Sequence, residues 1–545
     1  MSIYPVTPLA PAYLLLLSAA LVLTVGPALT VHRRHWLMVA GSGLALLSLF
    51  IVGRHYLTAA VRQPSPGTPP VHVLAEWLGE PALAMRVSPF EPFLWMLMVS
   101  LLAISLAKRD TLDRMSGPSE YPVLSQAALF VLIAVACGVV LAGTYRSAAF
   151  ALLVFDGAAA LFLLVHQQPR MATGRLLLGV LSSASVVALA QGMDHPSPYA
   201  PELGGFFSFT IWLRLGLYPL IEGEAPGDSL PARLGWTVAN LAVGLYLVST
   251  GVAPWVIWLA GATTVLHGLL AWLEPGRERA LAHTGYALAG GILVMAAVVE
   301  DKPAIMAASL STLAALAALE LTLPRLGRPD WRHPHRLWVY LPPLLATVSL
   351  VGVPFTLGWE GRGVLYRAIW QAGMPGTLAL VIVAEGAALS ALYHIWRGLF
   401  RGAPTEAARV WRPLGAALAV IPFLIPVAGP LLLHSVALPA AEGIRPQTEF
   451  GPYPMSAALG LIGSLLWAFF LGYGRHRLLE AIPFSRTALM SILRLSWLLQ
   501  RSEQALDTLS RLLLRVRAVI EGEHYLAWAI LLALGLGLLV ALRRE

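Results

Sequence analysis

The sequence contains little charge, a single cysteine and almost no lysine. Charged residues make up 12% of the 545 residues, about half the share of a typical soluble domain. Cys137 lies in an apolar run and cannot by itself form a disulfide or hold an iron–sulfur cluster. No phosphate loop, Cys-x-x-Cys pair or His-Glu-x-x-His zinc motif occurs. No catalytic constellation is therefore present, and we expect a chain without a cofactor, metal or redox centre of its own.

Long apolar runs take up most of the chain, and 57% of its residues are hydrophobic. A helix of about 20 apolar residues crosses the hydrocarbon core of a bilayer, so the runs predict about sixteen spans. They lie near 8–29, 36–53, 91–107, 123–143, 147–167, 174–191, 204–221, 234–252, 255–273, 280–299, 303–323, 338–371 (broken in its middle), 376–399, 411–434, 453–473 and 525–542. The first run lacks a basic leader and a cleavage site, so we interpret it as a retained span.

Arginine placement predicts the orientation of the spans. Loops after odd-numbered spans carry most of the arginines, whereas the loops at 55–90, 192–203 and 435–452 hold few. The positive-inside rule therefore predicts a multi-pass protein of the cell's inner membrane with its N-terminus outside. The net charge of +8 reflects this bias. It does not indicate nucleic-acid binding, because no basic cluster alternates with aromatics on a soluble domain.

Four charged residues lie inside the apolar runs or at their broken ends: Asp156, Arg214, Arg362 and Glu385. A charge inside the bilayer is costly, so such residues usually pair or face an internal path. We expect Asp156 to pair with Arg214, since each is isolated in apolar sequence and an unpaired buried charge is strongly destabilising. Charges spaced through many spans indicate ion movement.

Two spans are interrupted by proline and glycine, near 214–232 and 352–363. Broken helices in corresponding halves, each beside a charge, are typical of inverted-repeat transporters. The alternative is a pair of interfacial turns whose arginines extend to water.

The order of five short motifs resembles the antiporter-like membrane subunits of respiratory complex I, membrane-bound hydrogenases and Mrp cation/proton antiporters. The match runs from about residue 85 to 415. The motifs are Phe155–Gly157; Arg214 with Pro219 and Ala225-Pro226; Arg279–Gly285; Ser349–Pro354 followed by Gly358–Arg362; and Ala391–Arg397.

The resemblance implies an all-α fold with about 14 core transmembrane helices in two inverted repeats, plus extra spans. It implies spans 1–3 in residues 1–122 and a first repeat with broken helix 7 in 123–273. A second repeat with broken helix 12 follows in 274–434, and a C-terminal span, lateral helix and last anchor span in 435–545. The implied function is that of an antiporter-like subunit of a redox-driven, proton- or cation-translocating complex of the NADH:quinone oxidoreductase or hydrogenase type. Other membrane subunits would be its partners.

The departures from the family concern its lysines. The whole chain has two, Lys108 and Lys302, both in predicted loops. The resemblance places the ion-translocation residues at Asp156, Arg214, Asn240, His283, Arg362 and Glu385, where Arg214, Arg362 and Asn240 replace lysines and His283 a tyrosine. Arginine does not release its proton in a relay. The titratable groups left at membrane depth are the two carboxylates with His267, His283 and His394, although each histidine also suits a helix-packing role.

Residues 485–522 carry leucine and isoleucine at three- and four-residue spacing, with arginines largely elsewhere. This pattern predicts an amphipathic helix lying in the membrane interface. It resembles the lateral helix of some family members and would contact a neighbouring subunit, or lipid alone.

Three functions remain open from the sequence. The chain conducts protons through a modified path, or it is a structural or coupling subunit that no longer conducts. The third is a free-standing carrier of a small anion or inorganic carbon, with Arg214 and Arg362 as substrate ligands.

Overall fold

The computed structural model describes most of the chain in two compact units, Met1–Arg486 and Thr487–Glu545. The described residues are 8–62, 71–77, 80–86, 91–107, 122–194, 200–217, 219, 230–299, 302–323, 326, 340–353, 356–401, 455–481, 486–494, 497, 501, 504, 508 and 511. The predicted spans at 411–434 and 525–542 lie outside these residues.

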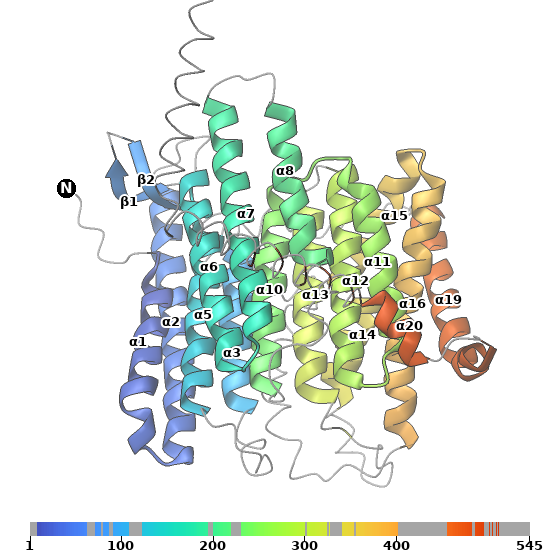
Figure 1. Ribbon diagram of the computed structural model, residues 1–545, viewed down its shortest axis with the longest axis horizontal. Helices are drawn as coiled ribbons and strands as arrows, with labels where there is room; N and C mark the ends of the chain where they lie inside the picture. The colour runs from blue at the N-terminus through green and yellow to red at the C-terminus, as the bar shows by residue number, and fades with distance from the viewer. Residues whose placement is uncertain are drawn as a thin grey trace, which may run out of the picture. The chain divides into compact units, whose positions relative to one another are not determined.

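The first unit is a bundle whose long helices run side by side (Figure 1). Its first half contains α1 (Ala10–Thr24), η1 (Gly26–Ala28), α2 (Val31–Arg62), α3 (Glu91–Ala107), α5 (Pro122–Leu141), α6 (Tyr145–Val165), α7 (Pro169–Asp194), α8 (Ala200–Trp212) and the π-helix η2 (Leu213–Leu217). Its second half contains α10 (Leu230–Thr250), α11 (Val256–Leu273), α12 (Arg277–Val298), α13 (Lys302–Thr322), α14 (Leu341–Val351), α15 (Leu357–Gln371), α16 (Pro375–Arg401) and α19 (Met455–Ala481).

Nine helices in the described part of the chain are long and apolar enough to cross a membrane. The predicted multi-pass helical fold is therefore confirmed. Lys302 begins α13, whereas the sequence had placed it in a loop. The boundaries of the predicted repeats stay a prediction.

A β-hairpin is the exception to the all-α expectation. Strands β1 (Val71–Trp77) and β2 (Glu80–Arg86) pair antiparallel in a segment that the sequence reading left as part of the long loop at 55–90. Valines alternate with a histidine at the start of β1, and a segment rich in proline precedes it. These are weak strand signals, and in a mostly helical chain they are easily passed over.

The predicted break at 352–363 is present, whereas the structure describes only the beginning of the one predicted at 214–232. In the second half, α14 ends at Val351, and Gly352 takes a left-handed conformation (φ 78°) before α15 begins at Leu357. In the first half, α8 continues into the π-helix η2, and the following residues 220–229 lie outside the described ones. A π-turn shifts the backbone hydrogen bonds by one residue and often marks a functional position.

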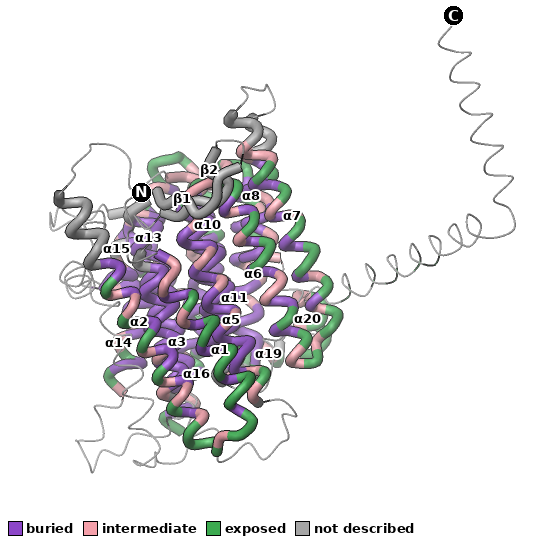
Figure 2. The backbone as a smooth tube through the Cα atoms, turned by 90° about the vertical axis from the view of Figure 1, so that its left-hand side faces the viewer, coloured by how far each residue is buried: buried purple, intermediate pink, exposed green. Residues whose placement is uncertain are grey.

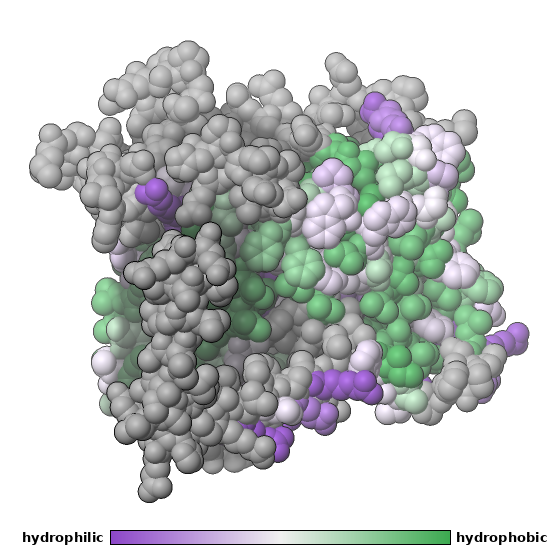
Figure 3. All heavy atoms as spheres, turned by 45° about the horizontal axis from the view of Figure 1, so that its top comes forward, coloured by the Kyte–Doolittle hydropathy of each residue, from purple (hydrophilic) through white to green (hydrophobic). Residues whose placement is uncertain are grey.

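Burial divides the bundle into an inner set of helices and an outer surface (Figure 2). The inner helices approach closely at small residues: Gly268 of α11 packs on the backbone of Ala384 of α16, where a side chain would not fit. The outer surface carries large apolar side chains such as Leu177 and Val180 of α7. Figure 3 shows such apolar residues along the described flank, with hydrophilic ones toward its edges. An apolar flank of this kind suits contact with lipid.

Candidate functional site

The first half of the bundle holds the predicted ion pair between Asp156 of α6 and Arg214 of η2. Arg214 donates from Nη1 to Oδ1 of Asp156 at 2.9 Å and from Nη2 to Oδ2 at 2.5 Å. Asp156 is 0% exposed and Arg214 2%. The bidentate geometry matches the planar guanidinium to the carboxylate. The expected Asp156–Arg214 pair is thus confirmed.

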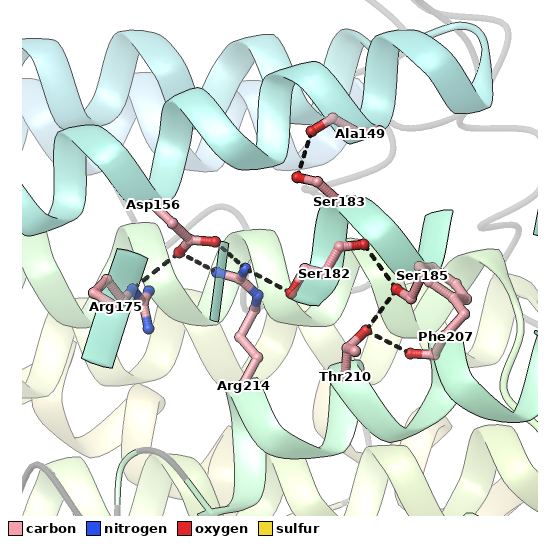
Figure 4. A network of polar contacts seen from close by, with 9 residues as sticks. All are labelled: Ala149, Asp156, Arg175, Ser182, Ser183, Ser185, Phe207, Thr210 and Arg214. Carbon is pink, nitrogen blue, oxygen red and sulfur yellow. Dashed lines mark hydrogen bonds and ion pairs between the residues drawn. The ribbon is translucent and has the colours of Figure 1, made fainter. Parts of the chain in front are cut away.

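A second arginine, missed by the sequence reading, shares the same carboxylate. Arg175 of α7 places its Nε 3.0 Å from Oδ1 of Asp156 and is 1% exposed. In Figure 4 the carboxylate lies between the two guanidinium groups, and Ser182 of α7 lies 3.4 Å from Nη2 of Arg214. The signal for Arg175 in the sequence is weaker than that for Asp156, because Arg175 lies at the start of the predicted span 174–191 and not in its middle.

Aromatic rings and a glycine complete this three-residue charge cluster. The guanidinium of Arg175 lies 5.2 Å from the ring centroid of Trp236, and that of Arg214 lies 5.7 Å from the centroid of Phe155. A desolvated cation is stabilised by such a ring face. Gly179 of α7 leaves room for Asp156, since a Cβ there would stand 2.7 Å from the Asp156 Cβ. The cluster of Asp156, Arg175 and Arg214 is therefore closely packed and carries one more positive than negative charge.

The π-helix connects this cluster to two histidines of the second half. Nε2 of His267 (α11) lies 3.0 Å from the carbonyl oxygen of Gly216, two residues after Arg214. Nδ1 of His267 lies 3.2 Å from Nδ1 of His283 (α12). A carbonyl only accepts, so Nε2 of His267 is the donor. In neutral His267, Nδ1 then accepts, and His283 donates from its own Nδ1. The hydrogen bonds therefore point in one direction, from His283 to Gly216.

In the second half of the bundle, Arg362 and Glu385 are both buried but form no ion pair among the described contacts. Arg362 of α15 donates from Nη1 to the carbonyl oxygen of Val351, at the end of α14, at 2.9 Å. Its Nη2 has no hydrogen-bond partner among the residues that the structure describes. A cation at a helix C-terminus is favourable, because the last carbonyls lack partners and carry partial negative charge.

Glu385 of α16 is 1% exposed and accepts a hydrogen bond from the hydroxyl of Tyr366 of α15. The Tyr366 oxygen also lies 3.3 Å from Oγ of Ser464 of α19. Sequence reasoning missed Tyr366, although it lies four residues after Arg362 and so on the same face of α15.

A small cavity of about 30 Å³ in the second half of the bundle is lined by both Arg362 and Glu385. Besides these two charges, its polar lining comes from Ser311 and Thr312 of α13 and Ser349 of α14. The remaining wall is formed by glycine and apolar residues: Leu288, Ile292, Met295, Ala308, Leu350, Gly358, Gly361 and Leu365. A polar cavity with several hydrogen-bonding groups is a place where water can be held.

Two of the residues expected to titrate or conduct lie apart from these groups. Asn240 of α10 is buried and donates to the carbonyl of Trp236 in its own helix at 2.9 Å. His394 of α16 is exposed, nine residues after Glu385. The structure thus brings together Asp156 with Arg214, connects this pair through Gly216 to His267 and His283, and places Arg362 with Glu385 around one cavity.

No group of three or more histidine, cysteine, aspartate or glutamate side chains suited to a metal occurs among the residues that the structure describes. The fold and the site therefore define a class of protein: a multi-pass helical membrane protein with buried charges beside two interrupted helices.

Comparisons with known proteins show what the chain is similar to. No family model matches the chain. It is 28% identical over 462 residues to NADH-quinone oxidoreductase subunit N of Cereibacter sphaeroides, covering 72% of this chain and 99% of the relative. The chain is thus similar in sequence to one antiporter-like membrane subunit, and it shares the fold of chains from three membrane complexes.

Three solved structures share the fold. A chain of the archaeal membrane-bound sulfane sulfur reductase superposes with a TM-score of 0.65 at 15% identity, covering 97% of this chain and 99% of that one. A chain of the Mrp complex from Dietzia sp. gives 0.67 at 17% identity, over 99% of this chain and 63% of that one. A chain of respiratory complex I from Thermus thermophilus gives 0.53 at 18% identity, over 78% and 99%.

Proposed function

We propose that this chain conducts protons as one membrane subunit of a multisubunit respiratory complex in the inner membrane, with its N-terminus outside. The observation that carries the proposal is the row of buried polar groups across the bundle. It runs from Asp156 and Arg214 through the Gly216 carbonyl to His267 and His283. Partnership with other membrane subunits is supported by its relatives, because the solved neighbours belong to such assemblies.

The second half extends this row toward Glu385. Gly291 of α12 is so close to α16 that a Cβ would stand 3.2 Å from Oε1 of Glu385. Gly291 follows His283 by eight residues of the same helix, about 12 Å at 1.5 Å per residue. Water in the cavity beside Glu385 would provide the remaining links for a proton.

Carboxylates and histidines carry the proton in this proposal, and the arginines do not. The guanidinium stays protonated at any working pH. Arg214 and Arg362 therefore act as fixed positive charges in the bundle and take no part in the proton transfers. Glu385 is the proton-binding group of the second half, and the histidine pair links the two halves.

A non-conducting coupling subunit is the second candidate, and one observation favours it. Asp156 is held by two arginines, so the first half presents a carboxylate that is hard to protonate without leaving two buried cations unpaired. In this case the first-half cluster has a structural role. The carrier of a small anion is disfavoured, because Arg214 already directs both terminal nitrogens at Asp156.

Proton uptake by vesicles containing the purified complex tests the proposal. Substituting Glu385→Gln or His267→Gln should abolish uptake while the complex stays assembled. Glu480→Gln, an exposed carboxylate of α19, is the matched control and should leave uptake unchanged. Normal uptake in both test variants would assign conduction to other subunits and leave this chain as a scaffold.

The C-terminal amphipathic helix would fix the chain to its partners. Of the predicted helix at 485–522, the structure describes α20 (Arg486–Leu493) and a few helical residues up to 511. Deleting 485–545 should leave the earlier spans inserted but reduce recovery of partner subunits in purification. Recovery of the full set would show that the helix contacts lipid only.

A further inference from the structure

One buried carboxylate has no place in the row of polar groups described above. Glu320 is in the last turn of α13 and is 0% exposed, and neither of its carboxylate oxygens has a hydrogen-bond partner among the described residues. A buried carboxylate without hydrogen bonds is costly when ionised. This arrangement fits the neutral acid, which is the form that has bound a proton.

An arginine with spare donors lies on α10, a helix that packs on α13. Arg233, in the first turn of α10, pairs through Nη1 with Glu278 of α12. Its Nε and Nη2 are buried and have no hydrogen-bond partner in the part of the chain that the structure describes. Among the described groups, Arg233 attracts and Glu278 repels a negative charge on Glu320. Arg233 thus has one carboxylate bound and a second within its electrostatic reach.

The two carboxylates differ in their access to water. The Glu278 side chain is 41% exposed, whereas that of Arg233 is 10% exposed and Glu320 is fully buried. Helices α10, α12 and α13 pack on one another, and all three residues lie within a few residues of helix ends at the same end of the bundle. The arginine distribution predicts that this end is cytoplasmic.

Glu320 also lies close to the level of the histidine pair. Leu316, four residues before Glu320, packs directly on Gly285 of α12, which is two residues after His283. Glu320 is therefore about 6 Å along α13 from that level. The other neighbours of α13 add no charge at this depth among the described residues: α14 and the described side chains of α3 are uncharged, and Arg362 of α15 lines the cavity near Thr312.

We propose that Arg233 is a two-position switch between Glu278 and Glu320, and that Glu320 is the proton-binding site which this switch controls. With Arg233 on Glu278, Glu320 holds a proton on one carboxylate oxygen. When that O–H bond breaks, the proton passes to a water molecule on the histidine side. Arg233 then leaves Glu278 and pairs with the Glu320 carboxylate. A hydronium ion arriving from the Glu278 side protonates Glu320 again, leaves water behind, and returns Arg233 to Glu278.

That the switch admits protons to the conducting path rests on the proposed function. The movement of Arg233 between Glu278 and Glu320 can be tested without measuring proton transport. Infrared spectroscopy of the intact complex reports the C=O band of a protonated carboxylic acid. We expect such a band in the wild type and its loss in Glu320→Gln. Glu278→Gln should remove most of the same band at unchanged pH, because Arg233 loses its first partner and moves to Glu320, which then ionises.

Two further variants complete the test. Arg233→Gln combined with Glu278→Gln should restore the band, since no cation is left to stabilise the Glu320 carboxylate. Glu480→Gln is the control and should leave the band unchanged. Because Glu278 is exposed, its variant should fold even if Glu320→Gln does not assemble.

The outcomes separate the switch from the proposed function. If the C=O band is lost in Glu278→Gln as expected, but the vesicles take up no protons, the switch is upheld and proton conduction by this chain is refuted. A band that is absent, or that does not respond to Glu278→Gln, would refute the switch even where uptake is normal.

Discussion

The two halves of the bundle stabilise their buried arginines through different partners. In the first half, Arg214 and Arg175 both bind the carboxylate of Asp156. In the second, Arg362 binds a helix-end carbonyl, Glu385 binds Tyr366, and both charges line a small cavity. We call the first arrangement a closed cluster, because opposite charges contact one another in it. We call the second arrangement open, because its two charges form no described ion pair.

This difference indicates which half can exchange protons. Protonating Asp156 would neutralise the carboxylate that two buried cations both contact, and breaking a buried pair typically costs about 3–5 kcal/mol. Protonating Glu385 leaves its hydroxyl partner in place, since a carboxylic acid can still accept from Tyr366. We infer that the first half contributes a fixed charge arrangement and that the second half contributes the titrating carboxylate.

The largest effect should follow from neutralising the closed cluster. Asp156→Asn removes the negative charge that Arg175 and Arg214 share, and we expect a loss of about 3–5 kcal/mol of stability. The resistance of the purified chain to SDS unfolding would measure it. Adding Arg175→Gln should recover part of the loss. If Asp156→Asn alone unfolds like the wild type, the cluster does not have the structural role inferred here.

A smaller effect should come from filling the space beside each carboxylate. Gly179→Ala places a Cβ 2.7 Å from the Asp156 Cβ, an atom that cannot move without its helix. Overpacking of this kind costs about 1–3 kcal/mol. Gly291→Ala meets only the end of the Glu385 side chain at 3.2 Å and should cost less.

Gly157→Ala is the control for the glycine pair, because nothing lies within 4 Å of a Cβ there. It should be neutral or stabilising by up to about 1 kcal/mol, as alanine favours the helix. Unfolding curves of the three variants would show in which half an added methyl group lowers the stability more. Equal costs for Gly179→Ala and Gly291→Ala would contradict the difference in packing.

The sequence predicted the charged positions of both halves because a charge within an apolar run is a strong signal. It identified Asp156, Arg214, Arg362 and Glu385, and it predicted the partner of Asp156 correctly. It missed Arg175 and Glu320, which lie within a few residues of span ends, where a charge is ordinarily read as belonging to the interface. Proximity to the end of a span does not reveal which face of the helix is buried.

The contacts of the second half could not be read from the sequence at all. That Arg362 would bind a carbonyl and not Glu385 depends on where the break after Val351 directs α15. Tyr366 becomes a partner of Glu385 only through the crossing of α15 and α16. Such relations are set by tertiary packing, and a one-dimensional pattern carries little information about them.

Removing the hydroxyl that binds Glu385 should have a moderate effect. Tyr366→Phe keeps the buried ring and deletes one hydrogen bond to a buried carboxyl group, so we expect a loss of about 1–2 kcal/mol. SDS unfolding would measure the stability, and proton uptake by vesicles would measure the function. Uptake should become slower but persist, because Glu385 itself remains. Complete loss of uptake with unchanged stability would instead make Tyr366 a member of the proton path.

The smallest effect should come from exchanging Arg362, the buried arginine of the second half, for lysine. Arg362 donates one described hydrogen bond, to the Val351 carbonyl, and a lysine ammonium at a helix C-terminus serves the same purpose. We expect Arg362→Lys to change stability by less than about 1 kcal/mol and to keep proton uptake. Arg214→Lys is the contrasting variant. It loses a bidentate pair that a compact ammonium cannot reproduce, so it should be clearly less stable in the same unfolding assay. Equal tolerance of lysine at both positions would show that the geometry of the closed cluster does not matter and that only its charge does.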